Sequence, residues 1–194
     1  MYRINNDQFI MPRKERTDKI AILARQGEII FHTQDLMVLW GIYNKNTLYT
    51  TIKRSVKKGS LYKIQKGMYS LLPISAIDPW MLGIKALHGF GYVSTETILS
   101  KTGIVNQLSL PVTLVGEKSL KFKVAGHDFI CRKLNDKFLH NTAGIIEING
   151  IRQASLERAV ADMLYFNHKF HFDNRKLIDW VKVNELRKKI YDLA

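Results

Sequence analysis

The stretch NKNTLYTTIKRSVKKGSLYKIQKGMYS, residues 44–70, constrains the fold more than any other part of the chain. Leu48, Ile52 and Val56 recur at every fourth residue, so they predict a helix with one apolar stripe. Gly59 tolerates the positive φ that ends a helix. The letters that follow, LYKIQKGMYSLL, are typical of two short strands joined through QKG. A helix followed directly by a β-hairpin is therefore expected.

Two further helices are predicted upstream of this helix. Thr17 can cap one that runs to about Gly27, and Thr33 can cap a second over QDLMVLW. The letters GIYN then predict a tight turn, after which Asn44 can cap the third helix. Helix, helix, turn, basic helix and hairpin is the element order of a winged helix-turn-helix, in which the third helix is offered to the major groove.

The predicted third helix and hairpin are strongly basic. Between residues 44 and 66 the chain has no Asp or Glu, and its cations are Lys45, Lys53, Arg54, Lys57, Lys58, Lys63 and Lys66. The whole chain of 194 residues has 30 Lys and Arg against 17 Asp and Glu, a net charge of +13. An excess of this sign favours an acidic partner, above all nucleic acid. The alternative is a solvated basic face on an ordinary three-helix bundle.

The candidate DNA-binding residues fall into three groups. Residues near the start of a recognition helix reach base edges, and here they are Lys45, Asn46, Tyr49, Thr50 and Lys53. Residues further along the helix are placed for phosphates, and here they are Arg54, Lys57 and Lys58. The residues of the predicted wing are Lys63, Gln65 and Lys66.

The composition changes after Pro73, which predicts a domain boundary near residue 74. Residues 1–74 form the expected winged helix-turn-helix domain, and residues 75–194 form a mixed α/β domain, so the fold class is α+β. Asp78 and Ser94 can each cap a helix. Strands are expected at LPVTLVG, LKFKVAG, HDFICRKL and AGIIEING. Their junctions GEKS and AGHD resemble hairpin turns, which predicts an antiparallel sheet, and two amphipathic helices end the chain.

Several other classes of protein are disfavoured. The single cysteine, Cys131, excludes an internal disulfide and a cysteine-based zinc site. The first residues have no apolar region typical of a signal peptide, and no window has membrane-spanning length, so a cytoplasmic protein is expected. His168 and His171 are three residues apart without a third ligand at a matching spacing. No metal and no cofactor are expected.

One alternative is catalytic. Asp128 and Glu147 have the chain order of a nuclease acid pair on adjacent strands, but no lysine stands two residues after Glu147. We therefore expect no enzyme, and keep a metal-dependent nuclease as the less favoured hypothesis.

Three motifs together resemble the AbiEi-type transcriptional antitoxins. LYKIQKGMYSL is similar to the strand–wing–strand pattern of that family, GYVSTETILSKTGI to its Y-(V/I)-S-x-x-(S/T)-A-L segment, and ASLERAVADMLY to its later helix with Glu-Arg-Ala and Asp. In the second motif Ile98 stands where a small residue is usual. The resemblance covers roughly residues 17–170. In the later helix the residues that match the recurring Glu-Arg-Ala and Asp are Glu157, Arg158, Ala159 and Asp162.

The resemblance implies a repressor that binds inverted repeats of double-stranded DNA in its own promoter. It also implies that the C-terminal domain is an antitoxin and regulatory domain, countering a nucleotidyltransferase-like toxin encoded next door in an abortive-infection system. A monomer or weak dimer that binds DNA cooperatively is expected, without membrane contact. Arg158 and Asp162, four residues apart, are interpreted as a structural ion pair. The alternatives are a basic protein–protein interaction module and a stand-alone regulator without a toxin.

Overall fold

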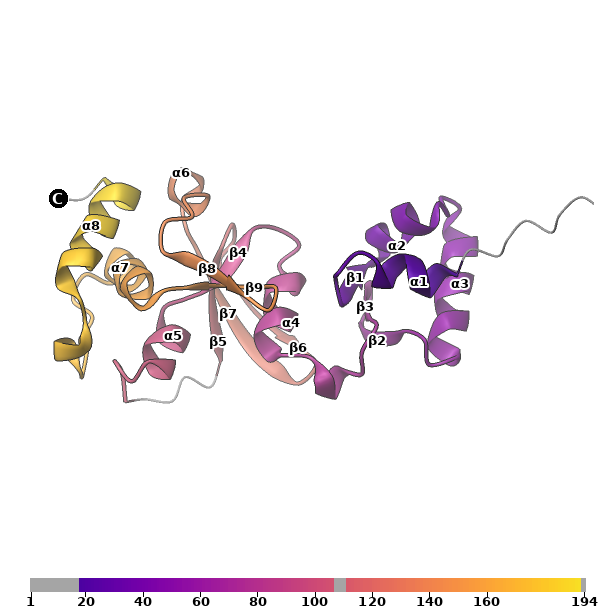
Figure 1. The fold of residues 1–194 in the computed structure, drawn as a ribbon, viewed down its shortest axis with the longest axis horizontal. Helices are drawn as coiled ribbons and strands as arrows, with labels where there is room; N and C mark the ends of the chain where they lie inside the picture. The colour runs from indigo at the N-terminus through magenta and orange to yellow at the C-terminus, as the bar shows by residue number, and fades with distance from the viewer. Residues whose placement is uncertain (1–17, 107–110, 193–194) are drawn as a thin grey trace, which may run out of the picture.

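The chain folds into two lobes that follow one another along the long axis of the molecule (Figure 1). The structure, a computed structural model, describes residues 18–106 and 111–192. We call residues 18–73 the N-terminal lobe and residues 77–192 the C-terminal lobe. Eight α-helices and two β-sheets lie within the described residues, so the expected mixture of helices and sheets is confirmed.

The N-terminal lobe combines three helices with a small antiparallel sheet. Its elements are α1 (Lys19–Ala24), β1 (Ile30–His32), α2 (Thr33–Trp40), α3 (Lys45–Lys57), β2 (Tyr62–Gln65) and β3 (Met68–Ser70). The sheet has the order β1-β3-β2, so the hairpin of β2 and β3 is extended by the strand that precedes α2. The helix and the hairpin predicted over residues 44–70 are both present.

The starts of the first two helices differ from the prediction by one residue. Asp18 caps α1, since its Oδ1 accepts a hydrogen bond from the Ile20 N–H at 3.0 Å, while Thr17 lies outside the described residues. Thr33 is the first residue of α2 rather than its cap. His32 is the N-cap, and its N–H donates to Asp35 Oδ2 at 2.7 Å. The Asp35 carboxylate, at the third position of the helix, thus binds the N–H of the N-cap residue, which is the carboxylate half of a capping box.

One hydrophobic cluster holds the helices of the N-terminal lobe together. Its buried members are Leu23, Phe31, Leu36, Trp40, Leu48, Ile52, Leu61 and Tyr69. The Trp40 indole N–H also donates to the backbone oxygen of Lys19 at 3.0 Å, which fixes α2 to the start of α1. The apolar stripe of α3 therefore faces this core, and the polar side of the helix is left for solvent.

The C-terminal lobe is built around a six-stranded sheet. After a 3-10 helix, η1 (Ile74–Ala76), its elements are α4 (Pro79–Ala86), β4 (Gly91–Val93), α5 (Glu96–Lys101), β5 (Val112–Gly116), β6 (Leu120–Val124), β7 (His127–Lys133), α6 (Asp136–Leu139), β8 (Ile145–Ile148), β9 (Ile151–Ala154), α7 (Leu156–Phe166), η2 (Arg175–Leu177) and α8 (Trp180–Tyr191). The two terminal helices are as predicted, and Asp78 caps α4 as predicted.

The prediction of an antiparallel sheet is wrong, because this sheet is mixed. Its strand order is β6-β7-β5-β4-β9-β8, in which β5 pairs with β7 in parallel and β4 pairs with β9 in parallel. The GEKS segment does not close a hairpin, since β7 lies between β5 and β6. The AGHD turn does close one, and Val124 faces His127 across it.

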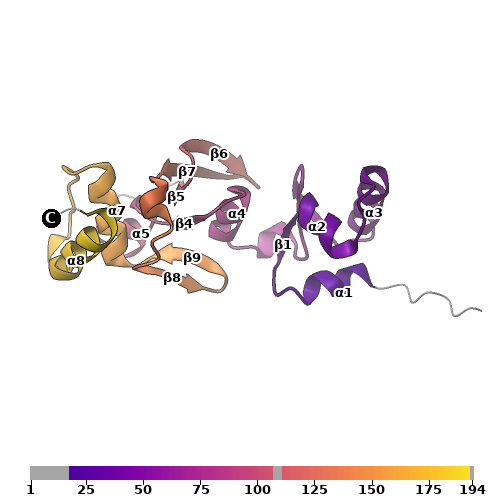
Figure 2. The ribbon, with the colours of Figure 1, turned by 90° about the horizontal axis from the view of Figure 1, so that it is seen from above.

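The sheet of the C-terminal lobe is covered on both faces. Figures 1 and 2 show α4 on the side toward the N-terminal lobe, α5 and α7 on the other side, and α8 outside α7. Gly83 lets α4 approach closely, because a Cβ at this position would lie 2.4 Å from a ring carbon of Phe129. Cys131 is buried on β7.

The two lobes meet at α4. The Nζ atom of Lys85 lies 2.6 Å from Glu28 Oε2, and His32 Nε2 lies 2.8 Å from the backbone oxygen of Lys85. Ile30 and Met68 of the N-terminal lobe belong to the larger hydrophobic cluster, whose other buried members lie in the C-terminal lobe. The lobes are therefore packed against each other, and the boundary near residue 74 remains a prediction.

Candidate nucleic-acid interface

The helix α3 is bounded by well-defined caps. Asn44 Oδ1 accepts hydrogen bonds from the Thr47 N–H at 3.1 Å and from Thr47 Oγ1 at 3.3 Å. The turn before it depends on Gly41, which has φ of 64°. At the other end Gly59 has φ of 71°, and the Ser60 N–H donates to the backbone oxygen of Ser55 at 3.1 Å. These caps fix which residues of α3 face outward.

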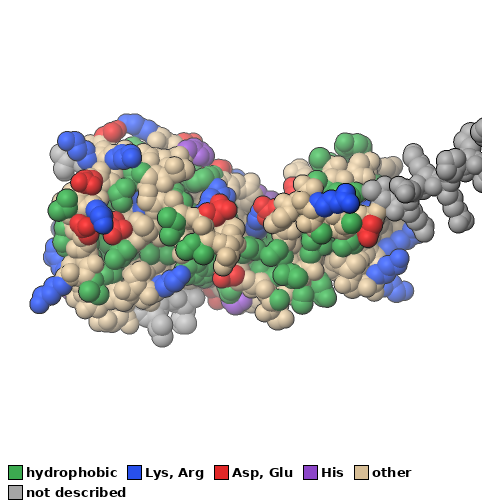
Figure 3. All heavy atoms as spheres, viewed as in Figure 1, with side chains coloured by type: hydrophobic (Ala, Val, Ile, Leu, Met, Phe, Trp, Pro, Cys, Tyr) green, Lys and Arg blue, Asp and Glu red, His purple; other side chains and the backbone are tan. Residues whose placement is uncertain are grey.

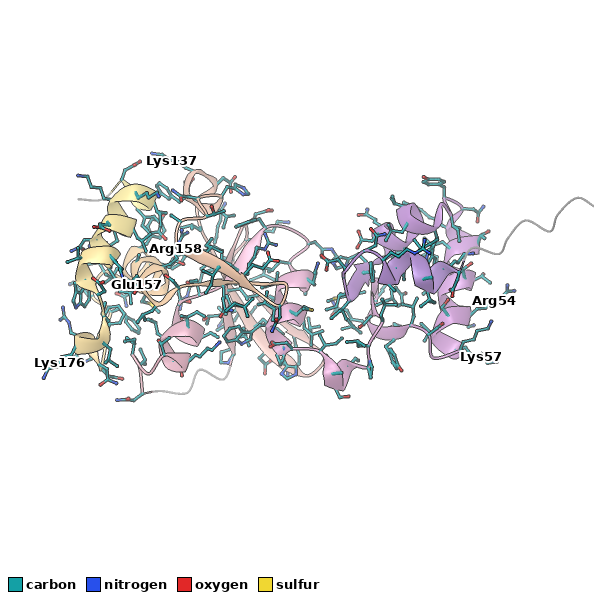
Figure 4. All side chains as sticks on the ribbon, in the orientation of Figure 1. Arg54, Lys57, Lys137, Glu157, Arg158 and Lys176 are labelled. Carbon is teal, nitrogen blue, oxygen red and sulfur yellow. The ribbon has the colours of Figure 1, made fainter. Side chains whose placement is uncertain are left out.

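The outward side of α3 carries all the residues that we predicted to meet DNA from this helix. Leu48 and Ile52 are buried, with 2% and 3% of their surface exposed. The side chains that are exposed are Lys45, Asn46, Tyr49, Thr50, Lys53, Arg54, Lys57 and Lys58. Figure 4 labels Arg54 and Lys57 at the end of the molecule remote from the C-terminal lobe, and Figure 3 shows Lys and Arg side chains gathered there.

No carboxylate among the described residues forms an ion pair with the cations of α3. The ion pairs found in the described part of the chain join other residues, such as Lys85 with Glu28 and Arg132 with Glu96. Arg54 and Lys57 lie in the last turn, where the helix dipole favours a cation. Lys45 lies at the first position, where the same dipole disfavours one. An external anion would offset this unfavourable placement.

The predicted wing residues lie on the hairpin. Lys63 and Lys66 are exposed, while Gln65 is half-buried. The hairpin turn is held in place because the Thr33 N–H donates to the backbone oxygen of Gly67 at 2.9 Å. Figures 1 and 2 show the three-stranded sheet on the side of the N-terminal lobe toward α4 and α3 on its outer side. The structure thus brings the α3 residues into one surface and places the hairpin residues on a separate element.

One exposed aromatic residue was missed by sequence reasoning. Tyr43 stands directly before the cap of α3, and 71% of its surface is exposed. Tyr49 on α3 is also exposed, at 54%. The signal that could have identified Tyr43 is its position in the turn GIYN. No helical period there predicts that a large aromatic side chain is buried, so an exposed ring could have been expected. Together the two tyrosines place aromatic rings at the start of α3.

The candidate acid pair does not form a site. Asp128 lies on β7 and Glu147 on β8, and β5, β4 and β9 separate these two strands in the sheet. Asp128 instead lies 3.2 Å from Lys123 Nζ on the neighbouring strand β6. The expectation that the two carboxylates stand on adjacent strands is therefore wrong. His168 and His171 are exposed, and no cluster of three or more metal-ligating side chains occurs in the residues described.

Arg158 and Asp162 form the predicted ion pair, and it lies in a buried network. Both side chains have none of their surface exposed, and Arg158 Nε donates to Asp162 Oδ1 at 2.7 Å. The other Asp162 oxygen accepts a hydrogen bond from Ser94 Oγ at 2.6 Å. The prediction that Ser94 caps α5 is therefore wrong, and Thr95 is the N-cap residue. Burial raises the pKa of Tyr92, whose hydroxyl also donates to Asp162, so this hydroxyl keeps its proton.

Further hydrogen bonds extend this network to the loop before β8 and to α8. Arg158 Nη1 donates to the backbone oxygens of Asn141 at 2.9 Å and Ala143 at 2.8 Å. The Tyr191 hydroxyl donates to Asp162, and burial raises the pKa of Tyr191 as well. Every charged atom is thus paired within the lobe, which supports the structural interpretation of the motif and gives Arg158 and Asp162 no free surface for a partner.

Comparison with known proteins adds no relative. A scan against models of protein families finds no match, and a search of curated proteins finds none. In residues 18–106 and 111–192 there is no helix with both the length and the apolarity needed to cross a bilayer. The candidate interface therefore rests on its own geometry and charge.

Proposed function

We propose that this protein is a DNA-binding transcriptional repressor that reads an inverted repeat in its own promoter through α3. The observation that carries the proposal is the outer face of α3, where exposed cations have no carboxylate partner in the described chain. A phosphate backbone supplies the anions that such a face lacks. In this role the protein acts in the cytoplasm.

The element order of the N-terminal lobe supports a winged helix-turn-helix. Two helices, a turn at Gly41, a capped basic helix and a hairpin follow one another, and β1 completes the small sheet. We assign base contacts to Lys45, Asn46, Tyr49, Thr50 and Lys53, and phosphate contacts to Arg54, Lys57 and Lys58. Lys63, Gln65 and Lys66 form the proposed wing, which contacts the DNA backbone beside the groove.

We further propose, on the motif resemblance, that the protein is also an antitoxin against a nucleotidyltransferase-like toxin encoded next door. The network around Arg158 and Asp162 is fully paired inside the C-terminal lobe, so toxin contact would use other surfaces of this lobe. The deciding measurement is growth of cells that express the neighbouring reading frame, with and without this protein. Growth that stays arrested in both cases would leave a stand-alone repressor.

The repressor proposal predicts that Lys53→Ala combined with Arg54→Ala abolishes specific binding. Fluorescence anisotropy would compare the duplex upstream of the coding sequence with a scrambled duplex of the same composition. We expect an affinity loss of about 30-fold or more, because the base contact of Lys53 and the phosphate contact of Arg54 each contribute about 1 kcal/mol or more.

The matched control is Lys176→Ala combined with Lys188→Ala, which removes the same charge from the C-terminal lobe. Figure 4 labels Lys176 at the end opposite to Arg54, and Lys188 lies in the last turn of α8, which Figure 1 shows at that end. Its affinity should stay within about twofold, since charges beyond a Debye length are screened. Equal binding of both duplexes would contradict the sequence-specific function. No binding to either duplex, with co-purification of an acidic protein, would favour the interaction module.

A further inference from the structure

The strand β8 forms an unprotected edge of the large sheet. It pairs with β9 on one side and stands last in the strand order, and Figure 2 shows β8 and β6 at the two outer edges. Three of its four residues are isoleucines, and Ile146 and Ile148 keep 46% and 47% of their surface exposed. An exposed apolar edge strand offers unpaired backbone groups to another strand.

The opposite edge of the same sheet is protected in the usual way. The strand β6 carries Lys121 and Lys123, both exposed, and Lys118 precedes it in the turn. Lysines on an edge strand prevent pairing with another chain. Because the two edges of one sheet differ in this respect, the apolar character of β8 is a feature of that edge and not of the sheet as a whole.

The exposed isoleucines of β8 stand beside a groove. Residues two apart on a strand point to the same face, so Ile146 and Ile148 are side by side. Ile148 lines an open cavity of about 390 Å³ together with Trp80 and Ile151. The cavity's charged lining residues are Asp78 and Lys101, one of each sign, and Lys101 Nζ lies 4.5 Å from the Trp80 ring centre. The groove can receive apolar side chains of an added strand.

The distribution of charge indicates what covers this edge. From Asn141 to Ile151 the chain has no Lys or Arg and one carboxylate, Glu147, in a protein of net charge +13. An acidic partner would be attracted to the cationic surfaces instead. Two copies of this chain carry the same net positive charge, and β8 itself contributes no cation to their repulsion, with Glu147 standing opposite Arg152 of β9. This apolar edge without a cation of its own is thus where a second copy can approach.

We propose that a second copy of this chain pairs with β8 through its own β8, in an antiparallel and two-fold symmetric contact. A symmetric contact uses the same patch on both copies, so each Ile146 and Ile148 meets its equivalents or the partner's groove. The strand is only four residues long. A contact of this size lies below the roughly 1,000 Å² typical of stable interfaces, so the dimer is weak. This contact does not depend on DNA binding.

Sedimentation of the full chain without DNA tests the contact. Between about 5 µM and about 500 µM we expect a shift from monomer to dimer, as for a weak complex. Ile146→Lys gives β8 an edge-strand lysine like those of β6, so it should weaken dimerisation at least about tenfold. The residue opposite position 146 on β9 is the neutral Gln153, so the new charge has no charged cross-strand partner. Val181→Lys, on the exposed face of α8, adds the same charge and should leave dimerisation unchanged.

Amide hydrogen exchange of the wild-type protein keeps the test independent of any variant. Amides of an antiparallel strand alternate in direction, and the Ile145 N–H already donates to the backbone oxygen of Thr142 at 2.9 Å, so the Glu147 amide is the one on β8 that a second copy would newly protect. This amide should exchange more slowly at high than at low protein concentration. The proposal is overturned if the chain stays monomeric throughout, or if Val181→Lys weakens the dimer as much as Ile146→Lys does. It is also overturned if the Glu147 amide is protected equally at every concentration, because a segment of the same chain would then cover the edge.

Discussion

Asp162 on α7 connects its helix with β4 and α8 in the core of the C-terminal lobe. Its two oxygens accept hydrogen bonds from Tyr92 on β4, Ser94 after β4, Arg158 on α7 and Tyr191 at the end of α8. All of these side chains are buried. A carboxylate in this position is stable because each lone pair is occupied and a guanidinium balances its charge.

We predict that Asp162→Asn destabilises the protein by about 3–5 kcal/mol, because Arg158 would be left as a buried charge without its partner. Urea denaturation followed by circular dichroism would measure the change in the free energy of unfolding. Lys182→Ala, which breaks the exposed pair with Asp179, should change it by less than about 0.5 kcal/mol. A loss below about 1 kcal/mol for Asp162→Asn would contradict a stabilising network.

At the scale of residues, local spacing predicted part of this network. Arg158 and Asp162 are four apart, so their pairing follows from the helical period alone. Their burial does not, because it depends on Tyr92 and Tyr191, which are 66 and 33 positions from Arg158 along the chain. Only the tertiary fold brings these hydroxyls to the carboxylate, so the spacing predicted the structural ion pair but not its burial.

The element that matters most for the proposed function is α3. Its cap, its apolar stripe and its end at Gly59 are all local features of the sequence, and the helix was predicted to within one residue at its C-terminal end. Strand partners were harder to predict. The turn-like GEKS segment suggested that β5 and β6 pair, but strand order depends on contacts between segments far apart, and β7 lies between them.

Two neighbouring asparagines of α3 should separate stability from binding. Asn44→Ala removes the cap and should lower the free energy of unfolding by about 1 kcal/mol. Asn46→Ala removes an exposed side chain proposed to read a base, so stability should change by less than about 0.5 kcal/mol.

The same Asn46 variant should lose about tenfold in affinity for the upstream duplex, because one good base contact contributes 1 kcal/mol or more. Urea denaturation and anisotropy titration of both variants would measure the two effects. If Asn46→Ala destabilised the protein as much as Asn44→Ala and left affinity unchanged, the assigned roles would be contradicted.

At the scale of the whole molecule, the proposed DNA-binding surface and the C-terminal lobe lie at opposite ends of the long axis. The basic helix α3 lies at one end, and the C-terminal lobe with α8 lies at the other (Figure 1). The cations of residues 44–66 were visible in the sequence, but not the exposure of those on α3 or their lack of an ion pair with any described carboxylate. Those two properties depend on how α3 packs, and they distinguish a surface for a polyanion from a self-neutralised one.

The salt dependence of binding to the upstream duplex tests the central claim most directly. If about six cations neutralise phosphates, the logarithm of the affinity should fall with the logarithm of the salt concentration with a slope near −5. Lys57→Ala combined with Lys58→Ala should make this slope shallower by about 2, equally for specific and scrambled duplexes. A slope near zero, or one that these substitutions leave unchanged, would contradict a DNA-binding role for α3.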